Sequence, residues 1–550
     1  MTSVVRGRSA LCILVAIAVW SAGLGVAGAA SSGPRQVSGS GTTPLTFDDA
    51  KAQGINVDWG PNCDTTTGKV AVPSGYAPPC VKPWTGGDNG GATAHGVTKD
   101  TITVALYQAQ PDLLQQAYFQ NSGSDESLAK ERDTTQAYID YFTSHYETYG
   151  RKVELVPIKA SGAPDDDVAA KADAIKVATE IKAFASFGGP AQTSAYAEEL
   201  AARGVLCVGD CLIAEPQKFL VQHSPYLWPT LASPEQASEH WAAFVGKQLG
   251  NGKASHAGSS ALAKKKRVYG IVHYDDDAGT FRGSVSTFKN LLARYHVTPK
   301  VTVPYTLDLA TAQDDARLVI TKLVTAGVTS VLLAGDPLFP TYLTKEATKQ
   351  QYFPEWIVLG YAYTDTAIFG RQYDQKQWAH AFGVSLLPAR TADDVDELAN
   401  LITWQTGKPP SAKTFRELVL SPLIFFTGVH LAGPDLTAKS FRAGLFRYPP
   451  AAGTTPTRLH LSWGRHNIWK GVDVTGGDDA TVIWWDPKAT GPDEVGRDGT
   501  GLYRYADGGR RYLPGQWPST PVGLYDDATS VTVLTTLPPA DAPPPYPSPA

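Results

Sequence analysis

The residues best suited to hold a small molecule lie between a short apolar strand and the helix that follows it. Residues 184–187 predict a strand that ends in the sequence Gly-Gly-Pro, and Thr193 and Ser194 then open a predicted helix over 195–203. A helix N-terminus leaves backbone N–H groups unpaired, and together with two hydroxyls these groups attract polar or anionic ligand atoms. The same order of strand, turn and helix also occurs in βαβ units that bind nothing. The segment therefore predicts a candidate ligand site, with a non-binding turn as the alternative.

Acidic side chains offer a second kind of chemistry. The run 275–277 (Asp-Asp-Asp) follows a predicted strand with His273 beside it, and Asp365 follows a later strand. An enzyme could use such groups, yet the sequence has neither a Gly-x-Ser-x-Gly elbow between a strand and a helix nor a His-Glu-x-x-His pair. A solvated loop explains the run better, and the acids at 165–167 fit a helix start better than a calcium site. An enzyme is therefore the least favoured function, and no cofactor is expected.

Cysteine usage indicates disulfide bonds. Apart from Cys12, the chain has Cys63, Cys80, Cys207 and Cys211, and four cysteines in an oxidising compartment allow three connectivities. We expect the local pairs Cys63–Cys80 and Cys207–Cys211. The three-residue gap of the second pair differs from the two-residue gap of the thioredoxin motif, so a structural bridge is favoured over a redox centre. No histidine accompanies either pair, so no metal site is expected.

The N-terminus predicts export. Arg6 and Arg8 precede an apolar run at 11–20 and the sequence Ala-Gly-Ala at 27–29, the order of a secretory signal peptide cleaved near Ala29. The run is too short to span a bilayer as a retained helix. No cysteine follows the cleavage region closely, so we expect a soluble protein without a lipid anchor. The formal net charge of −5 and the lack of a basic face argue against nucleic acid as a partner.

From residue 96 onward, strands and helices are predicted to alternate. Two such sets, before and after about residue 230, predict two α/β lobes in which helices cover parallel sheets. Residues 30–95 look irregular, and the first cysteine pair is expected to staple them. Residues 465–536 are rich in glycine and aromatic residues and predict a smaller β-rich addition; its aromatic residues are expected to form a core, with a carbohydrate-binding surface as the alternative. The proline-rich tail 537–550 is expected to be disordered.

Several passages together resemble the type I periplasmic-binding-protein family, specifically the branched-chain amino-acid (Leu/Ile/Val) binding branch of ABC-transporter substrate-binding proteins. The likeness covers roughly residues 96–470 and rests on the order and spacing of seven segments: 96–104, 186–208, 268–274, 330–335, 357–360, 421–431 and 436–445. The resemblance implies an α/β fold of two Rossmann-like lobes joined by crossover strands, which close on a ligand. The expected division is signal peptide 1–29, extension 30–95, lobe I 96–232, lobe II 233–365, return to lobe I 366–464, β-rich addition 465–536 and tail 537–550.

The resemblance also implies where the ligand is held. Thr193 aligns with the family hydroxyl that binds the ligand carboxylate. Ala362 stands where amino-acid receptors carry an acid for the ligand ammonium, so a carboxylate or amide ligand is expected in place of a leucine-like one, because a buried ammonium without a partner is costly. Contacts carried over from the family fall on Tyr107, Gln108, Gln192, Thr193, Ser194, residues 210–213 including Cys211, Ser233, residues 277–279 including Asp277, Asp336, and residues 361–365 including Tyr361, Tyr363 and Asp365.

These expectations combine into a leading hypothesis. The protein is predicted to be an extracytoplasmic, monomeric solute receptor that captures a small organic ligand and delivers it to an ABC permease. An exported sensor of the same fold, which signals to a membrane partner, is the alternative, and a secreted enzyme is less favoured.

Overall fold

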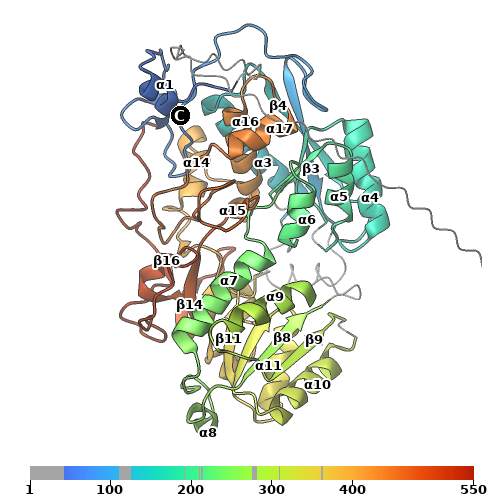
Figure 1. The fold of residues 1–550 in the computed structure, drawn as a ribbon, viewed down its shortest axis with the longest axis vertical. Coiled ribbons are helices and arrows are strands. Elements are labelled where there is room, and N and C mark those ends of the chain that lie inside the picture. Colours follow the sequence, from blue (N-terminus) through green and yellow to red (C-terminus); the bar gives the residue numbers. More distant parts are fainter. Residues whose placement is uncertain are drawn as a thin grey trace, which may run out of the picture. The chain divides into compact units, whose positions relative to one another are not determined.

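The structure, a computed structural model, describes residues 43–110, 126–190, 192–209, 211, 215–275, 282–308, 310–360 and 363–550. The predicted signal peptide lies outside the described residues. Most of the strands belong to two large sheets, each covered by helices (Figure 1).

The first sheet has five parallel strands in the order β4-β3-β5-β6-β7. The strands are β3 (Thr101–Gln108), β4 (Lys152–Lys159), β5 (Ala185–Phe187), β6 (Leu206–Val208) and β7 (Leu227–Trp228). The helices between them are α3 (Leu128–His145), α4 (Asp167–Lys176) with a π-helical turn at Val177–Ile181, α5 (Ala195–Ala202) and α6 (Gln217–Gln222). We call this unit lobe I.

Helices from a later part of the chain complete lobe I. They are α14 (Glu397–Thr406), α15 (Phe415–Leu418), α16 (Leu420–Ala432) and α17 (Ala438–Leu445), and they share one hydrophobic core with the first sheet. By length and hydropathy the stretch Phe415–Ala432 would pass for a membrane span, but 78% of it is buried inside the protein. It is therefore explained as the central core helix of lobe I.

The second sheet has eight strands, with β15-β14-β12-β11-β10-β8-β9 in order and β16 paired to β14. Five strands are parallel: β8 (Tyr269–Tyr274), β9 (Val301–Tyr305), β10 (Ser330–Ala334), β11 (Glu355–Leu359) and β12 (Ala381–Ser385). Three strands run antiparallel at one side: β14 (Ala480–Pro492), β15 (Asp498–Tyr505) and β16 (Arg511–Tyr512). We call this sheet and its helices lobe II.

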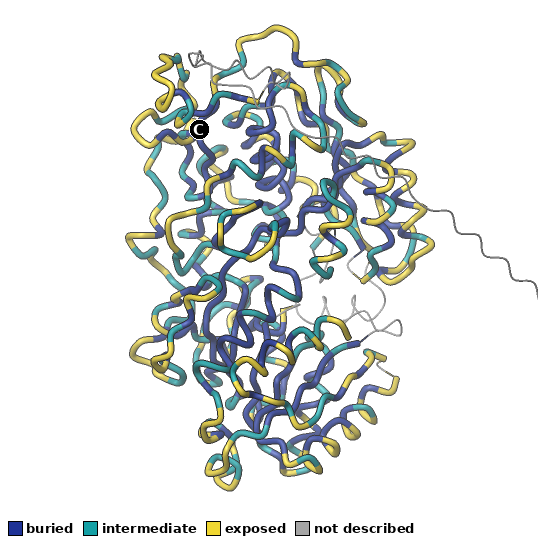
Figure 2. The backbone as a smooth tube through the Cα atoms, viewed as in Figure 1, coloured by how far each residue is buried: buried dark blue, intermediate teal, exposed yellow. Residues whose placement is uncertain are grey.

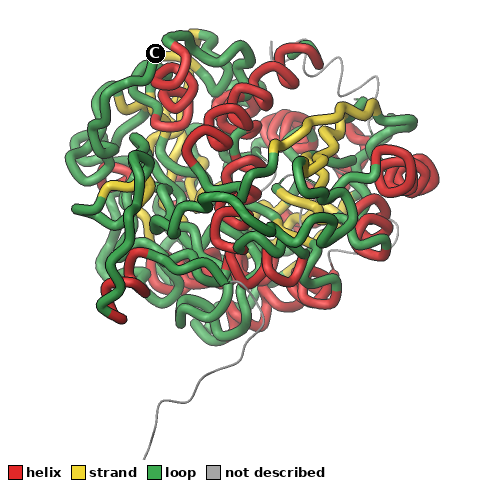
Figure 3. The backbone as a smooth tube through the Cα atoms, turned by 90° about the horizontal axis from the view of Figure 1, so that it is seen from above, coloured by secondary structure: helices red, strands yellow, loops and turns green. Residues whose placement is uncertain are grey.

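Both faces of the second sheet are covered, which explains why its parallel strands read as continuous apolar runs. Val331 and Leu333 of β10 pack into one core with α10 (Ala312–Thr325) and α11 (Phe339–Lys349), whereas Leu332 packs into the opposite core with α7 (Pro234–Phe244) and α9 (Arg282–Ala293). This alternation follows from the two-residue period of a strand. Figure 2 shows the buried parts of the backbone in dark blue, and Figure 3 shows the strands in yellow. Shorter elements are a π-helical turn (Val245–Leu249), α8 (Ser260–Ala263), α12 (Ala367–Gly370), α13 (Gln375–Trp378) and a 3-10 turn (Ala506–Gly509).

Three segments connect the two sheets: 229–233, 386–389 and 459–479. Hydrogen bonds hold the first and third together, because Gly476 N–H donates to the Pro229 carbonyl at 3.1 Å and Gly477 N–H donates to the Thr230 carbonyl at 2.7 Å. The second is followed by β13 (Arg390–Thr391), which pairs with β17 (Val533–Leu534). The first and third crossovers thus form one connected strip of chain.

The N-terminal extension has the disulfide that the sequence predicts. Cys63 and Cys80 are bonded with their Cα atoms 5.7 Å apart. Around them lie α1 (Phe47–Gln53), β1 (Cys63–Asp64) and β2 (Lys69–Val70). His430 of α16 fixes this extension to lobe I, because its ring Nε2 lies 3.0 Å from the Pro79 carbonyl.

Other predicted boundaries differ from the structure. β12 pairs in parallel with β11, so lobe II continues past residue 365. The aromatic segment from residue 465 does form strands, but β14 pairs with β12, so these strands extend the second sheet. Its aromatic residues are largely buried, which agrees with the core interpretation: Trp484, Trp485, Tyr503, Tyr505, Tyr512 and Trp517.

The expectation of a disordered tail is wrong, because residues 537–550 are hydrogen-bonded along lobe I. Trp404 Nε1 donates to the Tyr546 carbonyl at 3.0 Å, and Tyr546 OH donates to Asp64 at 2.9 Å. Asp541 is fully buried and accepts the Thr457 hydroxyl at 2.7 Å. The proline content indicated that the tail forms neither helix nor strand. It did not reveal the hydrogen bonds that hold this segment on lobe I.

Candidate ligand-binding site

The predicted turn of lobe I lies at the carboxyl edge of the first sheet, where open α/β sheets bind ligands. Gly188 has φ +72°, and a Cβ there would lie 2.9 Å from the Tyr107 carbonyl oxygen. A Cβ on Gly189 would lie 2.7 Å from the Cys211 carbonyl oxygen. Both positions therefore require glycine, because the backbone after β5 runs close to the end of β3 and to the segment that follows β6.

Thr193 and Ser194 open α5 as predicted, but Thr193 already has partners. Its hydroxyl donates to the Asp167 carboxylate and accepts the Ala195 N–H at 3.1 Å. Ser194 precedes the helix without a capping hydrogen bond from its side chain, and Gln192 is exposed. The Thr193 hydroxyl thus binds a carboxylate in this structure, and that carboxylate belongs to α4.

Tyr107 and Gln108 of β3 are used inside lobe I. The Tyr107 hydroxyl donates to Asp173 at 3.1 Å, and its ring lies 4.6 Å from that of Tyr196. Burial raises the pKa of Tyr107, so the phenol stays protonated. Gln108 donates its side-chain amide to the Leu128 carbonyl at 2.8 Å. In this structure, these two side chains fix the edge of the sheet through contacts within lobe I.

The predicted bridge between Cys207 and Cys211 is wrong in this structure, because both are free, buried thiols. The Cys211 Sγ lies 3.1 Å from the Gly188 carbonyl and 3.3 Å from the Ser186 carbonyl, to which its S–H can donate. Cys211 therefore holds the end of β5 through these contacts. Spacing alone predicted the bridge and could not reveal this competing set of partners.

Ser233 caps a helix of lobe II, and Asp336 lies in the turn that precedes another. Ser233 forms a capping box with Gln236 at the start of α7 and is buried. Asp336 accepts the N–H groups of Leu338 at 2.7 Å and Phe339 at 2.9 Å, and also the Tyr305 hydroxyl at 2.6 Å. Burial raises the pKa of Asp336. Both side chains are therefore occupied by local structure.

Of the predicted contacts after β11, Tyr363 and Asp365 are described. Tyr363 has φ +66° and is 44% exposed. Asp365 is buried, accepts the Ser385 hydroxyl at 2.5 Å, and has a pKa raised to about 6 by its burial. Tyr361 and Asp277 lie outside the described residues, as do Asp210, residues 212–213, residues 278–279 and Ala362.

The acid and histidine weighed as catalytic groups lie after β8. One oxygen of Asp275 accepts the Arg282 guanidinium at 2.9 Å, and its other oxygen is buried without a partner. His273 is buried with its Nδ1 2.9 Å from the Tyr274 carbonyl, and burial lowers the pKa of the ring. A pocket of about 330 Å³ runs from Asp275 along β9 to Lys322 of α10.

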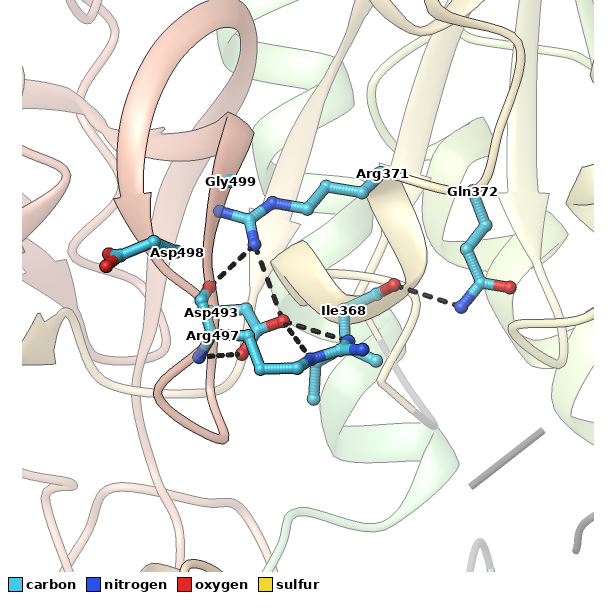
Figure 4. A pocket seen from close by; sticks show the side chains of 7 residues that line it. All are labelled: Ile368, Arg371, Gln372, Asp493, Arg497, Asp498 and Gly499. Carbon is cyan, nitrogen blue, oxygen red and sulfur yellow. Dashed lines mark hydrogen bonds and ion pairs between the residues drawn. The ribbon is translucent and has the colours of Figure 1, made fainter. Parts of the chain in front are cut away.

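A second pocket, of about 410 Å³, lies between α12 and the tip of the β14–β15 hairpin (Figure 4). Asp493 is buried there and accepts Arg371 at 3.4 Å and Arg497 at 3.1 Å. Arg371 also donates to the Gly491 carbonyl at 2.7 Å. The pocket includes none of the predicted ligand contacts, and the charges of Arg371, Asp493 and Arg497 are paired with one another. In the described part of the chain, no group of three or more His, Cys, Asp and Glu side chains could hold a metal ion.

Asp167 is the residue that sequence reasoning missed at this site. It was read only as a charge at a helix start, yet it binds Thr193 across 26 residues of chain. No pattern along the sequence links an acid in one helix to a hydroxyl in the next. The contact exists because α4 and α5 both begin at the carboxyl edge of the first sheet.

Comparison with known proteins gives a family match and a fold match. The family model described as periplasmic binding protein matches residues 119–458. Among solved structures, the fatty acid ABC transporter substrate-binding protein from Thermomonospora curvata is 14% identical with a TM-score of 0.50, over 77% of this chain and 97% of that one. A solute-binding protein of an ABC transporter from Rhodopseudomonas palustris HaA2, in complex with p-hydroxybenzoic acid, is 12% identical with a TM-score of 0.50, over 76% and 98%. No curated protein matches the sequence at a significant level.

Proposed function

The chain belongs to the periplasmic binding protein family, and from this premise we propose that it captures a small organic ligand between its lobes and delivers it to an ABC permease. Solute binding outside the cytoplasm is the role of this family. The observation that carries the proposal is that the family match spans strands of both sheets and the first two crossovers. The mechanism is closure of two lobes and requires no bond chemistry.

The ligand is a small carboxylate or amide. On lobe I, the Thr193 hydroxyl already binds one carboxylate, that of Asp167, so it has the geometry to bind a ligand carboxylate or carbonyl in exchange. On lobe II, the acids Asp336 and Asp365 are committed to internal hydrogen bonds. Neither is therefore available to pair with an ammonium group, which disfavours amino acids because a desolvated ammonium needs a partner.

Titration calorimetry on the full chain tests this proposal. We expect at least one of p-hydroxybenzoate, benzamide and palmitate to bind with micromolar affinity, and leucine to bind more weakly than that ligand. Native mass spectrometry of the exported protein would identify a co-purified molecule. Folded protein that binds none of these classes, or that binds leucine best, would contradict the proposal.

Substitution of Thr193 tests the placement of the site. Thr193→Val removes the hydroxyl and keeps the shape, so binding of the ligand found by titration should weaken by about tenfold, the value of one hydrogen bond to a charged group. Thr179→Val is the matched control, because its exposed hydroxyl donates only to the Ile175 carbonyl at 2.8 Å. Equal affinities in both variants would show that the site lies elsewhere.

Substitution of Asp167 separates the two ligand classes. Asp167→Asn removes a negative charge beside Thr193, so an anionic ligand should bind about fivefold more tightly, corresponding to about 1 kcal/mol of like-charge repulsion in a solvated setting. A neutral amide should gain far less. Asp165→Asn is the control, because Asp165 is exposed and belongs to the same acidic run. An anionic ligand that binds less tightly to Asp167→Asn would refute the assignment.

A further inference from the structure

The two cysteine pairs of the described chain are in different states. Cys63 and Cys80 are bridged, whereas Cys207 and Cys211 are free thiols, each 1% exposed. A protein that works outside the cytoplasm meets oxidising conditions. A free thiol pair there requires a physical explanation.

The two free thiols both lie beside Ser186, next to the candidate ligand turn. Cys207 of β6 lies opposite Ser186 of β5 in the parallel register, and the Cys211 Sγ lies against the carbonyls of Ser186 and Gly188. Both thiols therefore lie beside the same residue of β5, and burial and the neighbouring Cys211 side chain raise the pKa of the Cys207 thiol. One of the two thiols also holds the backbone of the turn.

We propose that Cys207 and Cys211 form a reversible dithiol–disulfide site that links the redox state of the surroundings to the Gly188–Gly189 turn. The chemistry at the sulfurs does not depend on the ligand. Its effect on ligand affinity rests on the proposed function, since that turn is the lobe I side of the candidate site.

The reaction is a thiol–disulfide exchange with an external low-molecular-weight disulfide. The thiolate of one cysteine attacks the external disulfide, forms a mixed disulfide and releases one external thiolate. The other cysteine then attacks the protein sulfur of that mixed disulfide, forms the Cys207–Cys211 bond and releases the second external thiolate. Two protein thiols lose two electrons and two protons, and one external disulfide becomes two thiols. An external dithiol reverses the reaction.

Oxidation removes the S–H of Cys211 and with it the contact to the Ser186 and Gly188 carbonyls. The turn that follows β5 is then held less firmly. Burial also raises the pKa of the Cys207 thiol, so few thiolates exist while the site is closed and exchange needs local opening. A ligand that binds the closed turn must, by linkage, slow the oxidation.

The test compares the full chain in the presence of oxidised glutathione and of dithiothreitol. Alkylation after denaturation, followed by peptide mapping, should show the thiols of Cys207 and Cys211 disappear together as one internal disulfide and return on reduction. Hydrogen exchange of a peptide over 184–190 should speed up by at least about threefold in the oxidised form, because the turn loses local stability.

Cys211→Ser is the matched control, because a hydroxyl at this position can still donate to the same carbonyls but cannot form the bridge. Its exchange rate over 184–190 should not respond to the oxidant. Three results would overturn the proposal: no internal disulfide in the presence of oxidant, a disulfide that resists dithiothreitol until the protein is unfolded, or exchange of the turn that is unchanged by oxidation. These readouts need no ligand, so a failure of the proposed transport function would leave them intact and would be recognised separately.

Discussion

The ion pair between Arg511 and Asp479 is expected to decide whether lobe II and its crossovers stay joined. Both side chains are fully buried. Arg511 Nε donates to one Asp479 oxygen at 2.9 Å and its terminal nitrogen donates to the other at 2.9 Å. The same guanidinium donates to the carbonyls of Leu386 and Leu387, in the crossover after β12. The pair thus connects β16, the second crossover and the end of the third.

We expect Arg511→Met to reduce the free energy of unfolding by about 3–5 kcal/mol, the usual cost of leaving one buried charge without its partner. After the substitution, the Asp479 carboxylate still accepts the backbone N–H of His460 at 3.1 Å. This uncharged donor cannot neutralise the negative charge. The double variant Arg511→Met/Asp479→Leu should lose less free energy of unfolding than Arg511→Met, because it also removes the unpaired carboxylate.

Urea unfolding followed by circular dichroism measures the loss, and hydrogen exchange over 384–388 and 479–481 shows whether it is local to the crossovers. Arg317→Met is the matched control. Its guanidinium pairs with Asp314 at 3.0 Å, but the two side chains are 58% and 72% exposed, so the expected change is below about 1 kcal/mol. Equal losses in the two arginine variants, or a double variant that is less stable than Arg511→Met, would refute the reasoning.

Three further outcomes are expected. Burial raises the pKa of Asp365 to about 6; its contribution to stability is therefore present below about pH 4 and is lost as pH rises through about 6, by about 3 kcal/mol. Between pH 4 and 7, the melting temperature of Asp365→Asn should fall less than that of the wild type. An equal fall in both proteins would contradict a raised pKa of Asp365. Burial lowers the pKa of His430 to about 4, so its contribution is present above about pH 6.5 and is lost as pH falls through 4, again by about 3 kcal/mol. In urea unfolding, His430→Gln should lose less stability than the wild type as the pH falls from 6.5 to 4. An equal loss in both proteins would contradict the interpretation that His430 is buried as a neutral ring. Asp541→Ala breaks the hydrogen bonds from Thr457 and should release the C-terminal tail to limited proteolysis, whereas a tail as resistant as in the wild type would show that other contacts hold it.

The fold was largely predictable because its signals are local. Apolar strands of four to seven residues alternate with helices that end at glycine, and this alternation predicted both parallel sheets. Short sequence separation also made the Cys63–Cys80 bridge predictable, and the structure confirms it. The membership of β14 and β15 in the second sheet was not predictable, because β14 pairs with β12 about a hundred residues earlier in the chain, beyond the reach of any periodicity.

The roles of the site residues were much less predictable. Tyr107, Ser233 and Asp336 have the right types and lie at the right strand ends, but the structure commits them to a buried hydrogen bond, a helix cap and the turn before α11. A residue type states which bonds a side chain can make, and only its neighbours in space determine which it does make. Asp277 and Tyr361 stay predictions, since they lie outside the described residues.

By itself, the sequence determined that this protein has two α/β lobes with a glycine turn, followed by Thr193, at the carboxyl edge of the first sheet. These properties follow from local spacing and backbone sterics. Tertiary structure alone decided that Thr193 binds Asp167, that Cys211 holds the turn as a free thiol, and that the tail packs on lobe I. The physical reason is that hydrogen bonds form between groups that the fold brings within about 3 Å of each other, whatever their separation along the chain.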